Sequence, residues 1–150
     1  GEALTGLNYL PRETPLTRQL DQRAKHLANE LEHYAHHPQH QFDLLFHPSG
    51  TPFQLRVWRA LLAIPAGQTL SYGDLAKQLQ TAPRAVGQAC GSNPLPLVIP
   101  CHRVVSRSAL GGFMHAASGA PLDIKAWLLG HERRGEKAPS PHPSPRGRGV

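Results

Sequence analysis

The chain has 150 residues, a formal net charge of +6 and 39% hydrophobic residues. This length predicts one domain with short attachments, and the 14 Gly and 15 Pro residues indicate that part of the chain forms loops. No apolar run approaches the ~20 residues that a membrane span requires, no signal segment is evident, and two cysteines are too few for a secreted disulfide scaffold. These counts exclude membrane-spanning proteins and disulfide-rich secreted proteins, and they favour a soluble intracellular protein.

The positive charge lies in the middle and at the end of the chain. Residues 1–43 carry four Lys or Arg and six Asp or Glu, residues 44–131 carry seven and two, and residues 132–150 carry five and two. A basic segment with so few acids favours a polyanionic partner such as nucleic acid. Basic solvated surfaces are also common, so charge alone leaves both interpretations open.

The first part of the chain predicts a strand and a long helix. Residues 1–10 are typical of one short strand, which is not stable by itself. A Thr-Pro pair then suits a helix N-terminus, and apolar residues at helical spacing predict an amphipathic helix over about 16–36 that Pro38 stops. We expect residues 1–48 to form this strand-and-helix unit and a linker.

Three shorter helices follow, each with its own start signal. Thr51 begins the first with a capping box and Pro52, and the turn at Pro65 ends it. Ser71 caps the second, and the third is predicted over about 83–91, from a proline to a glycine. Because a tight turn separates the last two, they are typical of a helix-turn-helix.

The last third of the chain is predicted to alternate between extended segments, loop and helix. A proline-bounded apolar segment at 93–100 leads to residues 101–105, which we expect to be extended and half-buried. A glycine-bearing loop follows over about 106–120, and a helix over about 121–131. The basic, proline-rich residues 133–150 predict a disordered tail. The expected fold class is therefore mainly α.

Cys101 is the first candidate for chemistry. It lies between a proline and His102, and a nearby imidazole or cation lowers the pKa of a thiol. Neighbours on an extended strand point to opposite faces, so a bridging water or a bend would be needed to connect the two side chains. The alternative is that Cys101 is a buried small hydrophobe, as we expect for Cys90.

Other candidates carry less chemistry. The His-rich run at 33–40 has helical ligand spacing in part, but Pro38 breaks the helix and no cysteine is near, so we expect only incidental metal binding. Arg84 begins the second helix of the helix-turn-helix and is either a DNA contact or a solvated residue. Tyr72 is by default a core or capping residue. No phosphate-binding glycine loop is present.

The segment Ile99–Val105, IPCHRVV, resembles the active-site motif of the O6-alkylguanine-DNA alkyltransferases, also called methylated-DNA–protein-cysteine methyltransferases. The further matching motifs follow in the family's order: Ser71-Tyr72-Gly73, Arg84-Ala85-Val86-Gly87, Asn93-Pro94, Lys125-Ala126-Trp127-Leu128-Leu129 and His131-Glu132. The resemblance covers about residues 52–132. It implies a DNA-binding and catalytic domain over 49–132, with a winged-helix-like helix-turn-helix, after a remnant of an N-terminal α/β domain.

The resemblance implies DNA repair by irreversible, single-turnover transfer of the alkyl group from O6-alkylguanine to Cys101, with no cofactor and no metal. O4-alkylthymine is a second candidate substrate. The implied catalytic residues are Cys101, His102, Glu132, Tyr72 and Asn93. The implied DNA-binding residues are Tyr72, Gly73, Arg84, Ala85, Gly87 and Arg107. The implied substrate pocket contains Pro96, Val104, Gly112 and Phe113.

The resemblance also implies how these residues act. The damaged nucleotide flips out of the stack, as enzymes that act on bases require. Arg84 then fills the vacated space, and Tyr72 presses on the adjacent phosphate and donates a proton to the purine. In the pocket, Cys101 is activated through a water held by His102, which Glu132 orients. The implied partner is double-stranded alkylated DNA, bound by a monomer in the cytoplasm, or at the nucleoid in a bacterium, and no membrane.

Three departures from the family pattern matter. First, family members usually carry a larger N-terminal domain, and in some of them that domain holds zinc. Second, the turn before Arg84 is shorter here by about two residues. Third, the loop between Phe113 and Leu122 is longer than in some members. The sequence therefore leaves two alternatives: a damage sensor without transfer chemistry, or an inactive truncated remnant. A Cys/His hydrolase is disfavoured because no oxyanion arrangement is evident.

Overall fold

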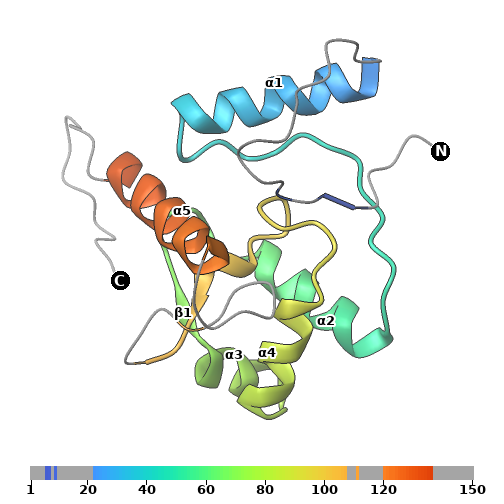
Figure 1. Cartoon of the computed structure of the whole chain (residues 1–150). Coiled ribbons are helices and arrows are strands. Elements are labelled where there is room, and N and C mark those ends of the chain that lie inside the picture. Colours follow the sequence, from blue (N-terminus) through green and yellow to red (C-terminus); the bar gives the residue numbers. More distant parts are fainter. Residues whose placement is uncertain (1–5, 8, 10–21, 108–110, 112–119, 137–150) are drawn as a thin grey trace.

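The computed structural model describes residues 6–7, 9, 22–107, 111 and 120–136, and within these ranges the protein is mainly helical (Figure 1). The elements in chain order are α1 (Gln22–His36), α2 (Pro52–Leu62), β1 (Leu70–Ser71), α3 (Tyr72–Leu79), α4 (Pro83–Gly91), the 3₁₀ helix η1 (Cys101–Arg103), β2 (Val104–Val105) and α5 (Ala120–Glu136). None of the helices in these ranges has the length and apolar character that crossing a membrane requires.

The start of α2 confirms the predicted capping box. Thr51 Oγ1 accepts from the Gln54 amide at 3.1 Å, and Gln54 Oε1 accepts from the Thr51 amide at 2.9 Å. Farther along α2, the buried Trp58 donates from Nε1 to the carbonyl of Ala89 at 2.8 Å. This bond ties α2 to α4, across the centre of the core.

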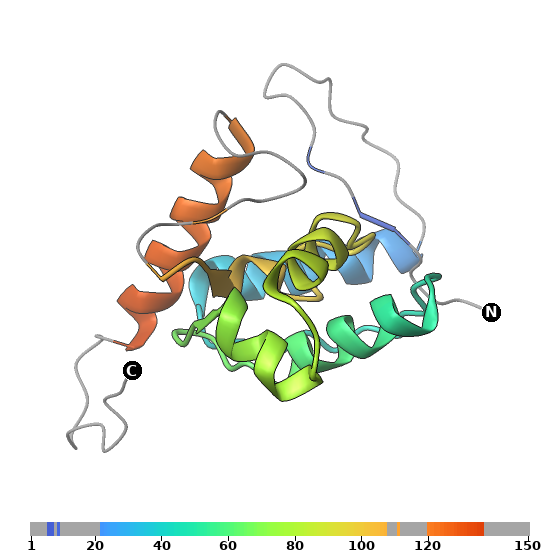
Figure 2. The ribbon, with the colours of Figure 1, turned by 90° about the horizontal axis from the view of Figure 1, so that it is seen from below.

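The cap of α3 and the extent of α4 are also as predicted. Ser71 Oγ accepts from the Asp74 amide at 2.9 Å and caps α3, while Gln80 ends that helix in the left-handed region with φ 56°. After the short turn, α4 runs over Pro83–Gly91 and packs against both α3 and α2 (Figure 2). The buried hydrophobic residues of this core include Val57, Trp58, Leu61, Ile64, Leu75, Ala76, Val86, Ala89, Leu95, Leu97, Val98, Ile99 and Val104.

The segment that carries Cys101 differs from the prediction. Residues 101–103 form a 3₁₀ helix instead of an extended strand, and they are buried instead of half-buried. The physical cause is the turn that starts at Pro100, whose carbonyl accepts from the Arg103 amide at 3.1 Å. Only Val104–Val105 is extended, and it pairs in parallel with Leu70–Ser71.

Helix α5 is longer than predicted, since it runs to Glu136 and not to residue 131. The guanidinium of Arg134 lies 6.0 Å from the ring centre of Trp127, and basic residues in a last turn interact favourably with the helix dipole. The first residues of the predicted disordered tail therefore continue the helix. Residues 137–150 lie outside the described residues.

Helix α1 lies on one side of the rest of the fold and is drawn above α2 in Figure 1. Helix α1 ends at His36, close to the predicted end, while residues 16–21 of the predicted helix lie outside the described residues. None of the described residues of the predicted first strand is in a strand. One of them, Leu7, instead donates from its amide to the carbonyl of Pro94 at 2.8 Å.

The link after α1 is fastened back onto that helix by Glu30. Its Oε1 is 2.9 Å from His40 Nε2 and accepts from the Asp43 amide at 2.6 Å. Burial raises the pKa of the Glu30 carboxyl, but these two donors outweigh burial and hold the pKa below its ordinary value. The link thus follows α1 before the chain enters α2.

Candidate active site

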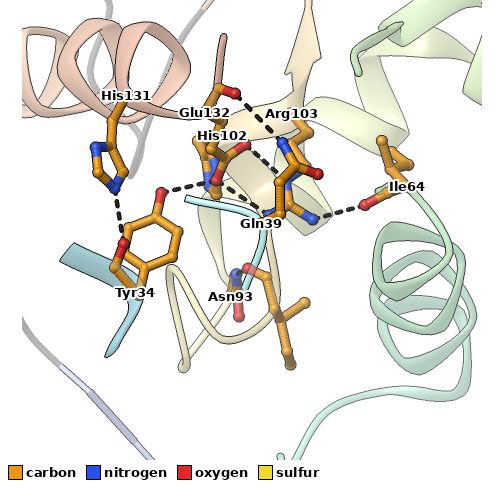
Figure 3. A network of polar contacts seen from close by, with 9 residues as sticks. Tyr34, Gln39, Ile64, Asn93, His102, Arg103, His131 and Glu132 are labelled. Atoms are coloured by element: carbon orange, nitrogen blue, oxygen red, sulfur yellow. Dashed lines mark hydrogen bonds and ion pairs between the residues drawn. The ribbon is translucent and has the colours of Figure 1, made fainter. Parts of the chain in front are cut away.

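The centre of the site is the sequence Cys101-His102 at η1, facing the last turns of α5. Cys101 is 3% exposed, and His102 and Glu132 are fully buried. His102 Nε2 lies 2.7 Å from Glu132 Oε2, although 30 residues separate the two in sequence. Figure 3 shows that His102, Arg103 and Tyr34 converge on this carboxylate (Figure 3). The structure therefore brings Glu132 next to His102, the residue that it was predicted to orient.

The bond to Glu132 determines which nitrogen of His102 carries the proton. A carboxylate only accepts, so we assign the hydrogen of the neutral imidazole to Nε2. The other nitrogen, Nδ1, is buried and has no hydrogen-bond partner in the part of the chain that the structure describes. Burial lowers the pKa of His102, and although the Glu132 carboxylate opposes this, the net shift is downward. His102 is thus a neutral base with Nδ1 ready to accept a proton.

Glu132 is held by donors from three directions. Arg103 donates from Nε to Oε1 at 2.9 Å and from a terminal nitrogen to Oε2 at 3.0 Å, and Tyr34 donates from Oη to Oε2 at 2.7 Å. Burial raises the pKa of this carboxyl, but the hydrogen bonds and charges of His102 and Arg103 outweigh burial and lower it to about 2. Glu132 is therefore ionised at neutral pH.

Arg103 is the counter-ion of this buried carboxylate. Besides its two bonds to Glu132, it donates to the carbonyl of Ile64 at 2.6 Å, in the turn that follows α2. A buried charge is tolerated when it is paired and hydrogen-bonded. Sequence reasoning missed this role, although a cation inside the otherwise apolar run IPCHRVV was a signal that a partner must be near.

Cys101 itself is a thiol at neutral pH. Burial raises its pKa to about 11, while the side chain of Asn93 and the charge of Lys125 act in the opposite direction without outweighing burial. A thiol in this state needs a base before it can act as a nucleophile. The neutral imidazole of His102, the next residue in the chain, is the base that we assign to this role.

Lys125 is a second buried cation that sequence reasoning did not place in the site. Its ammonium donates to the carbonyl of Val104 at 2.7 Å and lies 5.6 Å from the ring centre of Tyr72. Burial lowers its pKa to about 8, although the cysteines Cys101 and Cys90 oppose that shift. Cys90 is buried on α4, as predicted for a small packed residue.

Asn93 braces the turn between α4 and Cys101. Its Nδ2 donates to the carbonyl of Ile99 at 2.8 Å, and its Oδ1 accepts from the Leu95 amide at 2.9 Å. Both bonds close the turn that contains Leu97, a non-glycine residue with φ 79°. The geometry of the Cys101 backbone therefore depends on this amide side chain.

The residues expected to contact DNA lie on and near α3 and α4. Tyr72 is the first residue of α3, and a Cβ at Gly87 of α4 would lie 3.9 Å from its ring. Arg84 is exposed at the second position of α4, while Gly73 and Ala85 are half-buried.

Arg107 is exposed near the end of the described segment and lies 3.6 Å from Asp74 of α3. Two of the four expected pocket residues, Pro96 and Val104, are buried, and both lie within five residues of Cys101 in the sequence. Gly112 and Phe113 lie outside the described residues.

The His-rich run does not form a metal centre in the described part of the chain. The rings of His33 and His40 lie 5.3 Å apart, and those of His33 and His37 lie 6.4 Å apart. No group of three or more His, Cys, Asp or Glu in the described ranges is arranged to hold a metal ion.

The chain matches a family model described as 6-O-methylguanine DNA methyltransferase, DNA binding domain, over residues 52–134. A Methanosarcina mazei methylated-DNA–protein-cysteine methyltransferase is 45% identical over 107 residues, which are 70% of this chain and 65% of that protein. A Shigella flexneri protein of the same name is 52% identical over 85 residues, covering 55% of this chain and 47% of that one. The chain thus spans between about half and two thirds of these relatives.

Solved structures agree with these matches. A crystal structure of Mycobacterium tuberculosis O6-methylguanine methyltransferase has a TM-score of 0.75 and 36% identity, covering 93% of this chain and 85% of that one. The structure of Mycobacterium tuberculosis OGT in complex with DNA has a TM-score of 0.73 and 36% identity, covering 90% of this chain and 83% of that one.

Proposed function

The chain belongs to the 6-O-methylguanine DNA methyltransferase family, and on this premise we propose that it repairs DNA by moving an alkyl group from O6 of guanine onto Cys101. The observation that carries the proposal is the buried Cys101 thiol followed by a neutral imidazole that is bonded at 2.7 Å to an ionised carboxylate. This arrangement supplies a nucleophile and the base that activates it.

The proton is transferred first. With Nε2 of His102 donating to Glu132, the buried Nδ1 is the acceptor that takes the proton of the Cys101 thiol through a bridging water. The buried carboxylate stabilises the imidazolium that forms. A thiol whose pKa is raised to about 11 by burial thereby becomes a thiolate at the moment of reaction.

The thiolate then attacks the alkyl carbon in line with the bond to O6. The S–C bond forms, the C–O bond breaks, and the electron pair of that bond goes to the guanine. We assign the proton that the departing guanine takes up to the hydroxyl of Tyr72. The products are unmodified guanine and a thioether on Cys101. The S–C bond of a thioether is not cleaved at ordinary pH, so each chain reacts once. The reaction balances without a cofactor.

The DNA-binding part of the proposal uses α3 and α4 as a helix-turn-helix in a winged-helix-like domain over 49–132. Arg84 is exposed at the start of α4, where it can enter the base stack when the alkylated nucleotide is flipped out. Tyr72 would press on the adjacent phosphate. The remaining proposed contacts to the DNA are made by Gly73, Ala85, Gly87 and Arg107.

The proposed pocket for the flipped base is bounded by residues on both sides of Cys101. In this proposal Pro96 and Phe113 are the apolar walls, and main-chain groups at Val104 and Gly112 read the base. Asn93 keeps the turn below the pocket closed. Double-stranded alkylated DNA is the proposed partner and the monomer the proposed state. We place the protein in the cytoplasm, because the thiol of Cys101 must stay reduced.

The test is to ask whether the base itself is repaired. A duplex with one O6-methylguanine is incubated with excess protein, and the DNA is then digested to nucleosides. We expect the modified nucleoside to be replaced by deoxyguanosine in an intact strand, with the methyl group on the peptide that contains Cys101 and none on the peptide that contains Cys90. A duplex that is bound but keeps its O6-methylguanine would instead identify a damage sensor.

A further inference from the structure

Tyr34 connects the N-terminal segment to the carboxylate of the site. It lies in α1 and is 98 residues from Glu132 in sequence, yet its hydroxyl donates to Glu132 Oε2 at 2.7 Å. The tyrosine is 3% exposed. Figure 3 shows it approaching Glu132 from the side of α1, whereas Arg103 approaches from η1 (Figure 3).

The position of Tyr34 is fixed by contacts other than the bond to Glu132. Its carbonyl lies 2.8 Å from Nε2 of His131, the neighbour of Glu132 on α5. Its ring packs on Phe42 with centres 5.5 Å apart and edge-on against His131 with centres 4.9 Å apart. The hydroxyl is therefore delivered to the carboxylate by a ring that packing already holds in place.

The hydroxyl of Tyr34 remains a donor at every working pH. Burial raises the pKa of the phenol, and the adjacent negative charge of Glu132 raises it further. Oε2 of Glu132 thus receives three donors, from Tyr34, His102 and Arg103, whereas Oε1 receives one from Arg103. Hydrogen bonds to an ionised oxygen spread its charge and make it a weaker base.

We propose that Tyr34 is a positioning residue of the alkyl-transfer site. It fixes the Glu132 carboxylate to which Nε2 of His102 donates, and by sharing the charge of that carboxylate it limits how strongly the imidazolium form of His102 is stabilised. The proposal rests on the proposed function. The consequence is that Nδ1 remains the acceptor for the thiol proton and that α1 belongs to the active site. The other titratable or charged groups that face this pair are His102, Arg103, Tyr9 and His131, and Lys125 acts on His102.

The test is the variant Tyr34→Phe, which keeps the ring between Phe42 and His131 and removes only the hydroxyl. We measure the single-turnover rate of methyl transfer from an O6-methylguanine duplex as a function of pH. The plateau rate should fall about tenfold. The carboxylate loses one of its charge-assisted hydrogen bonds and therefore positions His102 less well. The acid midpoint, which is the pH at which the rate has fallen to half of its plateau on the acid side, should rise. Without the hydroxyl, more of the Glu132 charge acts on His102 and stabilises its imidazolium form more strongly.

The matched control is Phe42→Leu, which disturbs the same packing and leaves the hydroxyl. It should lower the melting temperature. Because His131 still contacts the ring and the hydroxyl is kept, it should move the acid midpoint of the rate much less than Tyr34→Phe does. A second variant carries 3-fluorotyrosine at position 34 in the otherwise wild-type chain. Its hydroxyl is a stronger hydrogen-bond donor to Glu132, so the acid midpoint should move down. Opposite shifts for the phenylalanine and fluorotyrosine proteins are the signature of the proposed role.

Two results would overturn the inference. One is a Tyr34→Phe protein with the wild-type rate and midpoint. The other is a slower Tyr34→Phe protein whose midpoint moves no more than that of Phe42→Leu. Both leave the proposed function intact, because the wild-type chain still transfers the methyl group in the same experiment. A wild-type chain that folds and binds the duplex without transfer would overturn the proposed function, and this inference with it.

Discussion

Gly111 lies against the ring of Tyr72, so close that a Cβ at position 111 would stand 2.8 Å from Cε2 and 3.1 Å from the hydroxyl oxygen. Its φ of 80° is also in the region that L side chains rarely adopt. Tyr72, to which we assign proton donation, is thus held in place by the backbone at residue 111. This backbone can come so near only because residue 111 has no side chain.

Gly111→Ala should therefore displace Tyr72 and strain the backbone. We expect the rate of methyl transfer from duplex DNA to fall between about tenfold and a hundredfold, since a small misplacement of a reacting group has effects of that size. The free energy of unfolding should fall by about 1–2 kcal/mol. Gly130→Ala is the control, because its Cβ would be 3.7 Å from its nearest neighbour, Arg134. A Gly111→Ala protein that matches this control in rate would contradict the assignment.

Arg84→Ala should separate DNA handling from chemistry. The arginine is exposed at the start of α4, so we expect its loss to slow transfer from duplex O6-methylguanine by about tenfold or more, because nothing then fills the stack after base flipping. Reaction with free O6-benzylguanine should be unchanged, as no base has to be flipped. Arg59→Ala, another exposed arginine, serves as the control on both substrates. Equal slowing on the two substrates would remove Arg84 from the DNA-binding role.

Asn93→Asp should weaken the turn below Cys101. The carboxylate can still accept from the Leu95 amide, but it cannot donate to the carbonyl of Ile99, which would be left buried beside a negative charge. We expect a loss of about 1–3 kcal/mol in the free energy of unfolding and a slower transfer. Urea unfolding and single-turnover kinetics measure the two effects, with the exposed Gln88→Ala as the control. An unchanged unfolding free energy would mean that the turn closes without the amide.

Glu132 should dominate the acid sensitivity of the fold. Its pKa is lowered to about 2 from an ordinary value of 4.5, because the bonds and charges of His102 and Arg103 outweigh burial. A group whose pKa is lower in the folded state stabilises the fold above its unfolded pKa and loses that effect as the pH falls through the folded value. The wild-type chain should therefore lose about 3 kcal/mol of stability between about pH 5 and pH 2 on account of this residue.

The variant Glu132→Gln checks this assignment. It should remove that part of the acid dependence, destabilise the fold at neutral pH by about 3–5 kcal/mol because Arg103 loses its counter-ion, and slow methyl transfer. Unfolding at a series of pH values measures the first two effects. If the wild-type and variant proteins have parallel stability curves from pH 6 to pH 2, the carboxylate is not the group that titrates.

Much of the helical frame was predictable from local signals. The capping box at Thr51, the cap at Ser71 and the extent of Pro83–Gly91 are set by residues within one turn of each boundary, and all three are confirmed. The sequence allowed a bend before Cys101 but did not predict the 3₁₀ turn at Cys101–Arg103. The side chain of Arg103 is buried there by its bonds to Ile64 and Glu132, which lie far away in sequence.

The same distinction holds within the site. Cys101, His102 and Glu132 stand in recognisable motifs, whereas the role of Tyr34 follows from a contact between residues 98 apart. From the sequence Tyr34 is one more apolar position on a helix, and nothing local to it indicates that its hydroxyl reaches α5. Lys125 is similar, since its burial against Val104 is a tertiary effect.

The central claim is that Cys101 is the acceptor of one alkyl group. The most direct measurement is the intact mass of the chain after incubation with excess O6-methylguanine duplex, for the wild-type protein and for Cys90→Ser and Cys101→Ser. The account predicts that the wild-type and Cys90→Ser chains each gain one methylene, with no second addition, and that Cys101→Ser gains none. A folded wild-type chain that binds the duplex and gains no mass, or a gain that persists in Cys101→Ser, would contradict it.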